Sequence, residues 1–351
     1  MHTLRIAARR LARHPGFTSL NAFGLAVGLA CALLALFYIR DETRVDRFHA
    51  DADRILAITL ADSTLTGGET WLSYPVADAV ADQPEVERAI RTTGPGTRRL
   101  RLSEGAGEVE SDMLFTEEGF FEMFSFPLAS GNPARILSEP NEIVLTPTSA
   151  TALFGDADPI GQTVEFFQSN WREPGVWIPL TVSAIALAPP HHSTIQFEAV
   201  ARFEARNDDG YGDADSWGMR WLQTYARLHS GTDVAAFTAA LPDRMSTVDP
   251  DNTEDSFWGQ QFYVPVPIAD VYFSVDTHGN QFTGKAAFMR LFGLIALAVL
   301  IIAILNYVNL ATARGLRMAR EVGVRKAVGA GRGQVARQLL VEALLLVSLA
   351  F

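Results

Sequence analysis

The residues of this chain best suited to act on a partner are the cations of one short stretch. Residues 314–337 hold seven lysine and arginine side chains and a single acid, Glu321. The cations are Arg314, Arg317, Arg320, Arg325, Lys326, Arg332 and Arg337. Cations at this density bind acidic protein surfaces or anionic lipid head groups. The chemistry that they suggest is docking rather than catalysis.

The sequence contains no residue pattern typical of an enzyme. It lacks GxxxxGK[ST], so we expect no ATP hydrolysis by the chain itself, and it also lacks HExxH, GxSxG and CxxC. The one adjacent histidine pair is His191 and His192. Neighbours on a strand point to opposite faces, so we interpret the pair as two loop histidines rather than a metal site. We therefore expect neither a metal nor a cofactor.

Composition indicates a protein that is part membrane and part aqueous domain. The chain has 351 residues, of which 48% are hydrophobic and 20% charged, with a mean hydropathy of +0.11. Its formal net charge of −11 argues against nucleic acid as the main partner. A single cysteine, Cys31, excludes an intramolecular disulfide and any site of several cysteines.

Two apolar segments are long enough to cross a membrane. Residues 14–39 contain no Asp, Glu, Lys or Arg, and a transmembrane helix needs only about 20 such residues. We expect an uncleaved helix at 19–39, because the apolar core of a signal peptide is only about 7–15 residues long. A second helix is expected at 286–313, where Leu291–Ala313 is free of formal charge.

Small and amide side chains in these segments predict helix packing. Gly24 and Gly28 form a GxxxG pair in the first helix, a spacing that lets another helix approach closely. Asn306 and Asn309 lie near the inner end of the second helix. They are suited either to bonding a neighbouring helix or to lying at the membrane interface.

Charge asymmetry predicts the topology. The N-terminal tail, residues 1–18, holds four arginines and no acid, whereas residues 40–285 hold 38 acids and 17 bases. By the positive-inside rule, the tail and residues 314–337 face the cytoplasm and residues 40–285 face outside. The tail is either a basic amphipathic helix on the membrane surface or a plain positive flank.

A third apolar run begins at residue 338 and reaches residue 351. It is too short to cross a core of about 30 Å. We expect it to be the start of a third membrane helix in a longer protein.

The segment between the two expected membrane helices predicts an α/β or α+β domain. Apolar runs of strand length alternate with helix-starting motifs, of which Thr146-Pro147 with Gly155 is the clearest. Expected strands are 55–60, 86–91, 142–145, 180–187, 196–203, 221–228 and 262–268. Expected helices are 75–82, 116–124, 147–154 and 233–241. The expected fold is a membrane α-helical protein with this extracytoplasmic domain inserted between transmembrane helices 1 and 2.

One motif resembles a known family. Arg320-Glu321-Val322-Gly323-Val324-Arg325-Lys326-Ala327-Val328-Gly329-Ala330 is similar to the R/K-E-x-G-[IV]-R-[KR]-x-x-G-A pattern of FtsX-like, MacB-like ABC transporter permeases. In that family the pattern follows the second membrane helix, as it does here. The segments 46–55, 124–131, 143–161 and 306–314 resemble further parts of the family in the same order.

The resemblance implies a permease that works with a separate cytoplasmic ABC ATPase. The residues expected to dock on that ATPase are Arg320, Glu321, Val322, Gly323, Val324, Arg325, Lys326 and Gly329. The resemblance also implies a multi-pass protein of the inner membrane with a MacB-like periplasmic core domain. Further expected partners are membrane lipid, a second permease unit or tandem half, and a periplasmic or outer-membrane protein. The function implied is export of a drug, toxin or peptide, or lipoprotein handling.

Three other interpretations remain open, of which the second comes from the resemblance. A membrane-anchored sensor is disfavoured, because a third apolar run stands where a signalling domain would follow. A regulator of cell-wall hydrolases is a further role within the same family. An anchored enzyme would need a catalytic constellation, and none is found. Charge alone favours a role for residues 314–337 that is limited to fixing the orientation of the chain in the membrane or contacting lipid. The resemblance favours coupling to an ATPase.

Overall fold

The structure is a computed structural model that describes residues 15–61, 68–103, 107–169, 175–206, 215–252, 261–274 and 286–327, together with 333 and 341. The chain divides into two compact units. One consists of residues 1–43 and 286–351, and the other of residues 44–285. We call the second the periplasmic unit, after the location that the sequence resemblance implies for it, and describe each unit by itself.

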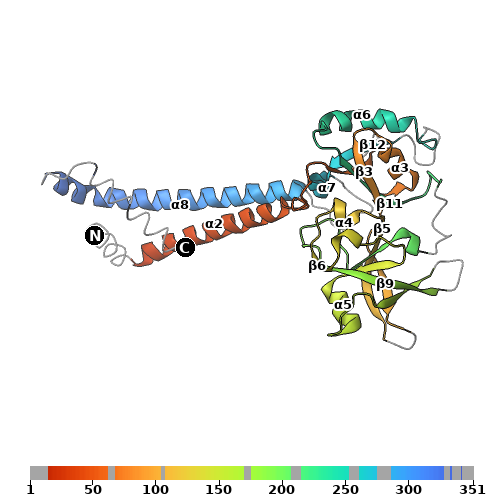
Figure 1. Ribbon diagram of the computed structural model, residues 1–351. Coiled ribbons are helices and arrows are strands. Elements are labelled where there is room, and N and C mark those ends of the chain that lie inside the picture. The colour runs from red at the N-terminus through yellow and green to blue at the C-terminus, as the bar shows by residue number, and fades with distance from the viewer. Residues whose placement is uncertain are drawn as a thin grey trace. The chain divides into compact units, whose positions relative to one another are not determined.

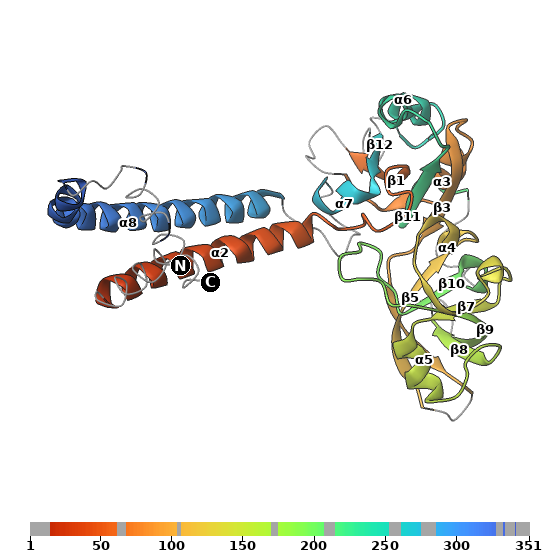
Figure 2. The ribbon, with the colours of Figure 1, turned by 60° about the vertical axis from the view of Figure 1, so that its left-hand side comes forward.

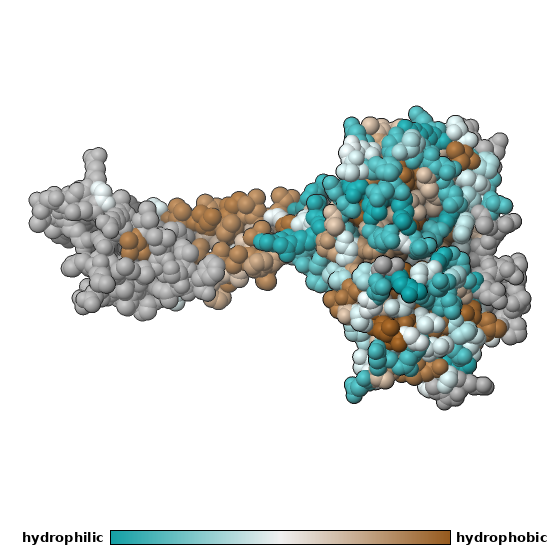
Figure 3. Space-filling view, viewed as in Figure 1, coloured by the Kyte–Doolittle hydropathy of each residue, from teal (hydrophilic) through white to brown (hydrophobic). Residues whose placement is uncertain are grey.

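The first unit is built on two long helices, α2 (Pro15–Glu42) and α8 (Ala286–Ala327), which run side by side (Figures 1 and 2). Each contains a segment that is long and apolar enough to cross a membrane, Ala22–Glu42 and Ala287–Asn306. Large hydrophobic side chains such as Phe23 and Ile302 are exposed on these helices. Figure 3 shows the described part of the pair as a largely hydrophobic surface. Such a surface is stable in lipid and not in water.

Helix α8 is longer than the membrane requires. Its 42 residues correspond to about 63 Å at 1.5 Å per residue, about twice a bilayer core of ~30 Å. The sequence predicts a helix to residue 313 followed by an inner loop or helix. The structure instead has one helix that continues without a break to Ala327. Three stretches lie outside the described residues. They are the tail 1–14, residues 328–337 of the basic segment apart from residue 333, and residues 338–351 apart from residue 341.

Twelve strands form the sheet of the periplasmic unit. They are β1 (Ile55–Ala61), β2 (Leu72–Ser73), β3 (Val86–Thr92), β4 (Gly96–Arg101), β5 (Val109–Thr116), β6 (Leu128–Gly131), β7 (Glu142–Leu145), β8 (Thr163–Gln168), β9 (Val176–Ala186), β10 (Ala199–Arg202), β11 (Arg220–Leu228) and β12 (Phe262–Pro267). The helices are α3 (Pro75–Ala81), α4 (Phe120–Met123), α5 (Pro147–Phe154), α6 (Val234–Ser246) and α7 (Ile268–Ser274), with short 3-10 turns at Pro133–Arg135 and Phe203–Ala205.

Six of these strands close into a ring. The order β10-β7-β9-β8-β4-β5 is hydrogen-bonded throughout, and β5 pairs in parallel with β10 to complete it. Alternate residues point inward and form one hydrophobic core that includes Leu100, Phe115, Val164 and Phe166. The ring is therefore a small barrel filled by its own side chains.

The sheet continues from β5 through β3, β11 and β1 to β12. A second core lies among these strands and helices α3 and α6, and its largest buried side chains include Tyr263 and Phe237. A third core, rich in aromatic residues, surrounds helix α4 and includes Phe120, Phe124 and Tyr225. The fold class expected from the sequence is confirmed, with two candidate membrane helices on either side of an α/β domain in the chain.

Several local predictions differ from the structure. The helix expected at 116–124 is only the single turn Phe120–Met123, because Thr116 ends strand β5. Helix α6 continues past Pro242 to Ser246, since the buried side chains Leu241 and Met245 hold both turns against the core. Strands β4, β5 and β8 were not expected; charged residues such as Arg99 and Glu165 interrupt their hydrophobic pattern.

Candidate functional site

Helices α2 and α8 contact each other through the small residues that the sequence singles out. A Cβ atom placed on Gly28 would lie 2.5 Å from the Cβ of Ala303, and one on Gly24 would lie 3.3 Å from Nδ2 of Asn306. Gly293 packs against Ile39 at the other end of the pair, so the helices are antiparallel. The glycines allow a backbone separation that a larger residue would prevent.

The other predicted site residues are distributed along α8. Asn309 is exposed, one helical turn beyond Asn306. Arg320, Glu321, Val322, Gly323, Val324, Arg325 and Lys326 lie in the helical backbone of the last part of α8. Gly329 lies outside the described residues. The structure therefore joins an apolar span and the basic segment in one helix.

A buried polar cluster follows the first membrane helix. The chain leaves α2 at Glu42, and Asp46 is fully buried within the periplasmic unit at a positive φ of 53°. Its Oδ1 accepts hydrogen bonds from Ser193 Oγ and the Thr194 backbone N–H, both at 3.0 Å, and its Oδ2 accepts one from Thr194 Oγ1. The backbone N–H of Asp46 donates to the carbonyl of His192 at 3.0 Å. These bonds fasten the segment after α2 to the loop 189–196.

His49 extends this cluster toward the aromatic core. Its Nδ1 accepts a hydrogen bond from the Ser125 backbone N–H at 3.1 Å, so the proton of the neutral ring is on Nε2. That nitrogen lies 3.9 Å from Asp46 Oδ1, and the ring packs against Phe48, Phe124 and Phe126. We call Asp46, His49, Ser193 and Thr194 the anchor cluster. Together they tie residues 44–54 to the core at two points.

Burial shifts both titratable groups of the anchor cluster toward their uncharged forms. Desolvation raises the pKa of Asp46 from 3.8 to about 6, and the hydrogen bonds from Thr194 and Ser193 oppose that rise. Desolvation lowers the pKa of His49 from 6.5 to about 4. Between these two values both side chains are neutral, so the cluster is a network of hydrogen bonds rather than an ion pair.

These shifts predict how stability depends on pH. The raised pKa of Asp46 gives a contribution that is complete below 3.8 and is lost as pH rises through about 6. The lowered pKa of His49 gives one that is complete above 6.5 and is lost as pH falls through about 4. The two nearly cancel in the wild type. In Asp46→Asn only the contribution of His49 remains, so the free energy of unfolding of this variant should rise by about 2 kcal/mol as pH increases from about 4.5 to about 7.5.

Urea unfolding of residues 44–285 at these two pH values checks this prediction. Other titrating groups are common to both proteins, so the difference between wild type and variant isolates Asp46. An identical pH dependence in the two proteins would contradict it.

The histidine pair occupies a loop, as the sequence suggests. His191 and His192 follow Pro190 and their rings contact each other, with centroids 5.0 Å apart. The two residues lie in a turn and not on a strand, so strand geometry does not set the directions of their side chains. Among the described residues, no group of three or more His, Cys, Asp or Glu side chains is arranged to hold a metal ion.

The anchor cluster is the part of the site that sequence reasoning missed. Asp46 and His49 stand in the segment that resembles the permease family, but their burial was not expected. The unusual local feature of Asp46 is its positive φ, and this feature is visible only in the structure. Ser193 and Thr194 are polar loop residues that resemble many exposed ones.

Comparison with protein families covers both units. Residues 18–244 match the model of the MacB-like periplasmic core domain, and residues 293–351 match that of the FtsX-like permease C-terminal segment. Comparison with curated proteins gives no significant match.

Solved structures of permease and transporter domains match part of this chain. A domain assigned to a permease of Porphyromonas gingivalis is 21% identical over 69% of this chain and 98% of its own, with a TM-score of 0.50. The periplasmic region of MacB from Actinobacillus actinomycetemcomitans is 12% identical over 63% and 91%, with a TM-score of 0.43. The extracellular domain of the ABC-type transporter YknZ from Gram-positive bacteria is 11% identical over 60% and 99%, with a TM-score of 0.39.

The first family model covers more than half of the chain, and its match begins in the first membrane helix and continues into helix α6. The second covers most of α8 and the residues after it. Two apolar helices and the domain between them agree with both matches. The chain therefore belongs to the FtsX-like, MacB-like family of ABC transporter permeases, membrane proteins that serve a cytoplasmic ATPase.

Proposed function

We propose that this chain is the mechanotransmission subunit of its transporter. ATP hydrolysis by the separate ATPase moves the inner end of α8, and the periplasmic unit moves in response. The proposed docking residues are Arg320, Glu321, Val322, Gly323, Val324, Arg325, Lys326 and Gly329. The transported or handled molecule is a drug, toxin, peptide or lipoprotein.

The observation that carries the proposal is the continuity of α8. One helix runs from Ala286, at the end of the periplasmic unit in the chain, through the apolar span to Ala327. A helix transmits displacement along its axis because each turn is hydrogen-bonded to the next. A push on Arg325 and Lys326 would therefore reach the outer end of the same helix.

The anchor cluster supports the proposed transfer of motion from helix α2 to the periplasmic unit. Only three residues separate Glu42, the last residue of α2, from Asp46, which is buried in the core. Because Asp46 is held by three side-chain hydrogen bonds, displacement of α2 is transferred to the loop 189–196 rather than absorbed. The small-residue contacts at Gly24 and Gly28 would let α2 and α8 act as one unit.

The proposed setting is the inner membrane, with several passes and the large unit in the periplasm. We propose two permease units or tandem halves per transporter, because members of the family with this N-terminal pattern often carry two copies of the unit. A periplasmic or outer-membrane partner would receive the motion of the periplasmic unit.

Reversing the charges of the docking segment tests the coupling. In Arg325→Glu/Lys326→Glu, association with the ATPase is expected to weaken roughly 100-fold, since each reversed interface charge costs at least ~1.4 kcal/mol. The measurement is copurification of the full-length permease with its Walker-motif ATPase from native membranes, followed by ATPase stimulation in nanodiscs.

The matched control is Arg9→Glu/Arg13→Glu, which makes the same charge change in the other cytoplasmic basic segment. It should leave association unchanged, while protease accessibility of the periplasmic unit verifies the topology of both variants. Equal loss in the two double variants would assign these cations to lipid anchoring. Unchanged copurification of Arg325→Glu/Lys326→Glu would refute the coupling role.

A further inference from the structure

The segment that follows the first membrane helix carries two exposed arginines. Arg44 and Arg47 are the first basic residues after Glu42, the end of α2, and both are exposed. The backbone N–H of Arg47 donates to the carbonyl of Arg44 at 3.2 Å, so the two residues lie on one turn. Asp46, which stands between them, is buried in the anchor cluster. The arginines are therefore held on the periplasmic unit just beyond the end of α2.

Chain length limits how far Arg44 can stand from the membrane core. The apolar run ends at Ile39, and the Thr43 N–H donates to the Ile39 carbonyl at 3.0 Å, so helical geometry extends to Thr43. Helical rise over these residues and one further step along the chain place the Arg44 Cα at most about 10 Å beyond Ile39. The head-group layer on each side of a bilayer is about 5–8 Å thick. For any orientation of the periplasmic unit, the Arg44 guanidinium can therefore reach lipid phosphates.

An ion pair brings helix α7, the last described element of the periplasmic unit, to the same place. Nη2 of Arg47 lies 3.8 Å from Oδ1 of Asp270 on this helix. Ile268 and Val271 hold the inner face of α7 in the aromatic core, and Figure 2 shows α7 beside β1 and β12. With about 3.6 residues per turn, Asp270 and Phe273 lie on the outer face of the helix. The Phe273 side chain is partly exposed there.

We call Arg44, Arg47, Asp270, Tyr272 and Phe273 the base of the periplasmic unit. The rings of Tyr272 and Phe273 pack edge to face with centroids 4.9 Å apart. The pair of Arg47 with Asp270 is long, and both side chains are about 60% exposed, so it contributes little to stability. Arginine and aromatic side chains next to the end of a membrane helix are typical of a membrane–water interface.

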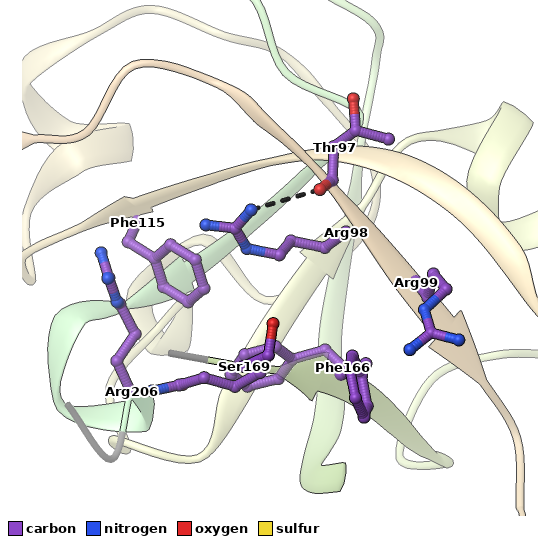
Figure 4. A pocket seen from close by; sticks show the side chains of 9 residues that line it. Thr97, Arg98, Arg99, Phe115, Phe166, Ser169 and Arg206 are labelled. Carbon is purple, nitrogen blue, oxygen red and sulfur yellow. Dashed lines mark hydrogen bonds between the residues drawn. The ribbon is translucent and has the colours of Figure 1, made fainter. Parts of the chain in front are cut away.

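The base does not coincide with the pocket of the barrel. That pocket has a volume of about 300 Å³ and is lined by other residues, among them Arg98 and Ser169 (Figure 4). Phe115 and Phe166 also line it, but they are 2% and 1% exposed and offer no open ring face to a ligand. The base instead presents side chains on an outer surface, which suits a layer of head groups better than one enclosed small molecule.

We propose that the base binds phospholipid head groups on the outer face of the membrane, with lipid phosphate on Arg44 and Arg47 and with Phe273 in the interfacial layer. A guanidinium group matches two phosphate oxygens with paired hydrogen bonds, and phosphate can replace the exposed Asp270 carboxylate as the partner of Arg47. This inference rests on the membrane setting proposed above. It does not depend on docking of the ATPase.

Photo-crosslinking of the full-length protein in native membranes tests the proposal. With p-benzoylphenylalanine in place of Phe273, irradiation is expected to give phospholipid adducts, which mass spectrometry identifies. The matched control carries the same probe in place of Phe262, which is 43% exposed at the other end of strand β12. This strand separates the two positions by about 17 Å, so the probe at Phe262 should give roughly tenfold less lipid adduct.

Charge reversal at Arg44 tests the phosphate contact. Arg44→Glu should lower the adduct yield of the probe at Phe273 roughly tenfold, because it opposes lipid phosphate, and Arg44→Lys should retain most of the yield. Arg135→Glu makes the same change at an exposed arginine of a 3-10 turn and should leave the yield unchanged.

Three results would each overturn the proposal. They are the absence of lipid adducts at Phe273, equal yields from the two probe positions, and equal yields with and without Arg44→Glu. Resistance of the protein to carbonate extraction from the same membranes reports on the membrane setting, and copurification with the ATPase reports on coupling. Failure of lipid binding is thereby distinguished from failure of the proposed function.

Discussion

Replacing Asp46 with alanine is expected to lower the free energy of unfolding of residues 44–285 by about 3 kcal/mol. The Thr194 hydroxyl and the Thr194 backbone N–H lose their acceptor within a buried cluster, whereas the Ser193 hydroxyl can still donate to the Ile195 carbonyl. Each buried donor left without a partner costs about 1–3 kcal/mol. Alanine also tolerates the positive φ of 53° less well than aspartate or asparagine does.

The measurement is urea unfolding at about pH 5, where the buried carboxyl is mostly uncharged because its pKa is raised to about 6. At this pH the change does not also relieve the cost of a buried charge. Asp46→Asn keeps the backbone preference and one acceptor, so its expected cost is about 1 kcal/mol or less.

Asp53→Ala is the control on the same segment. Asp53 is exposed and its removal should change stability by less than about 0.5 kcal/mol. Equal effects of Asp46→Ala and Asp53→Ala would show that the anchor cluster does not hold the segment after α2.

Local chemistry made much of the fold predictable. The two membrane helices follow from the absence of charge over a span of bilayer length. Helix α5 begins where the Thr146 hydroxyl accepts a bond from the Ser149 N–H, and it ends at Gly155, which has a φ of 60°. Each of these features depends on residues within a few positions of one another, so the sequence displays them directly.

The barrel could not be predicted in the same way. Its closure depends on the parallel pairs β5–β10 and β7–β9, which join strands far apart in the chain. Pairing between strands that are distant in the chain produces no repeating pattern of residues in the sequence. On β4, Arg98 looks like any polar residue of a half-exposed strand, and only ring closure turns its face toward the interior.

The burial of Asp46 was hidden for a related reason. It stands in a polar stretch with Asp51 and Asp53, and nothing local distinguishes the three. Its partners Ser193 and Thr194 are 147 and 148 residues away, so the difference arises only from tertiary structure. The helix pair shows an intermediate case, because GxxxG predicts a close contact without identifying its partner.

Replacing Gly28 with leucine is expected to separate α2 from α8 and to destabilise the helix pair by about 3 kcal/mol. The first added carbon alone would lie 2.5 Å from the Cβ of Ala303, closer than carbon atoms can approach. The remaining atoms of leucine would extend the overlap, and overpacking of this kind costs about 1–3 kcal/mol or more. The measurement is equilibrium unfolding of the full-length protein in mixed detergent–SDS micelles.

Ala30→Leu provides the matched control, because Ala30 is a small residue on the exposed side of the same helix. It should change stability by less than about 0.5 kcal/mol. Gly28→Leu/Ala303→Gly removes the Cβ that the new side chain would meet, so it should recover part of the loss. Recovery would place the effect at the contact itself, whereas equal losses in Gly28→Leu and Ala30→Leu would mean that the two helices do not pack through Gly28. If α2 and α8 act as one unit in coupling, Gly28→Leu should also reduce ATPase stimulation while copurification persists.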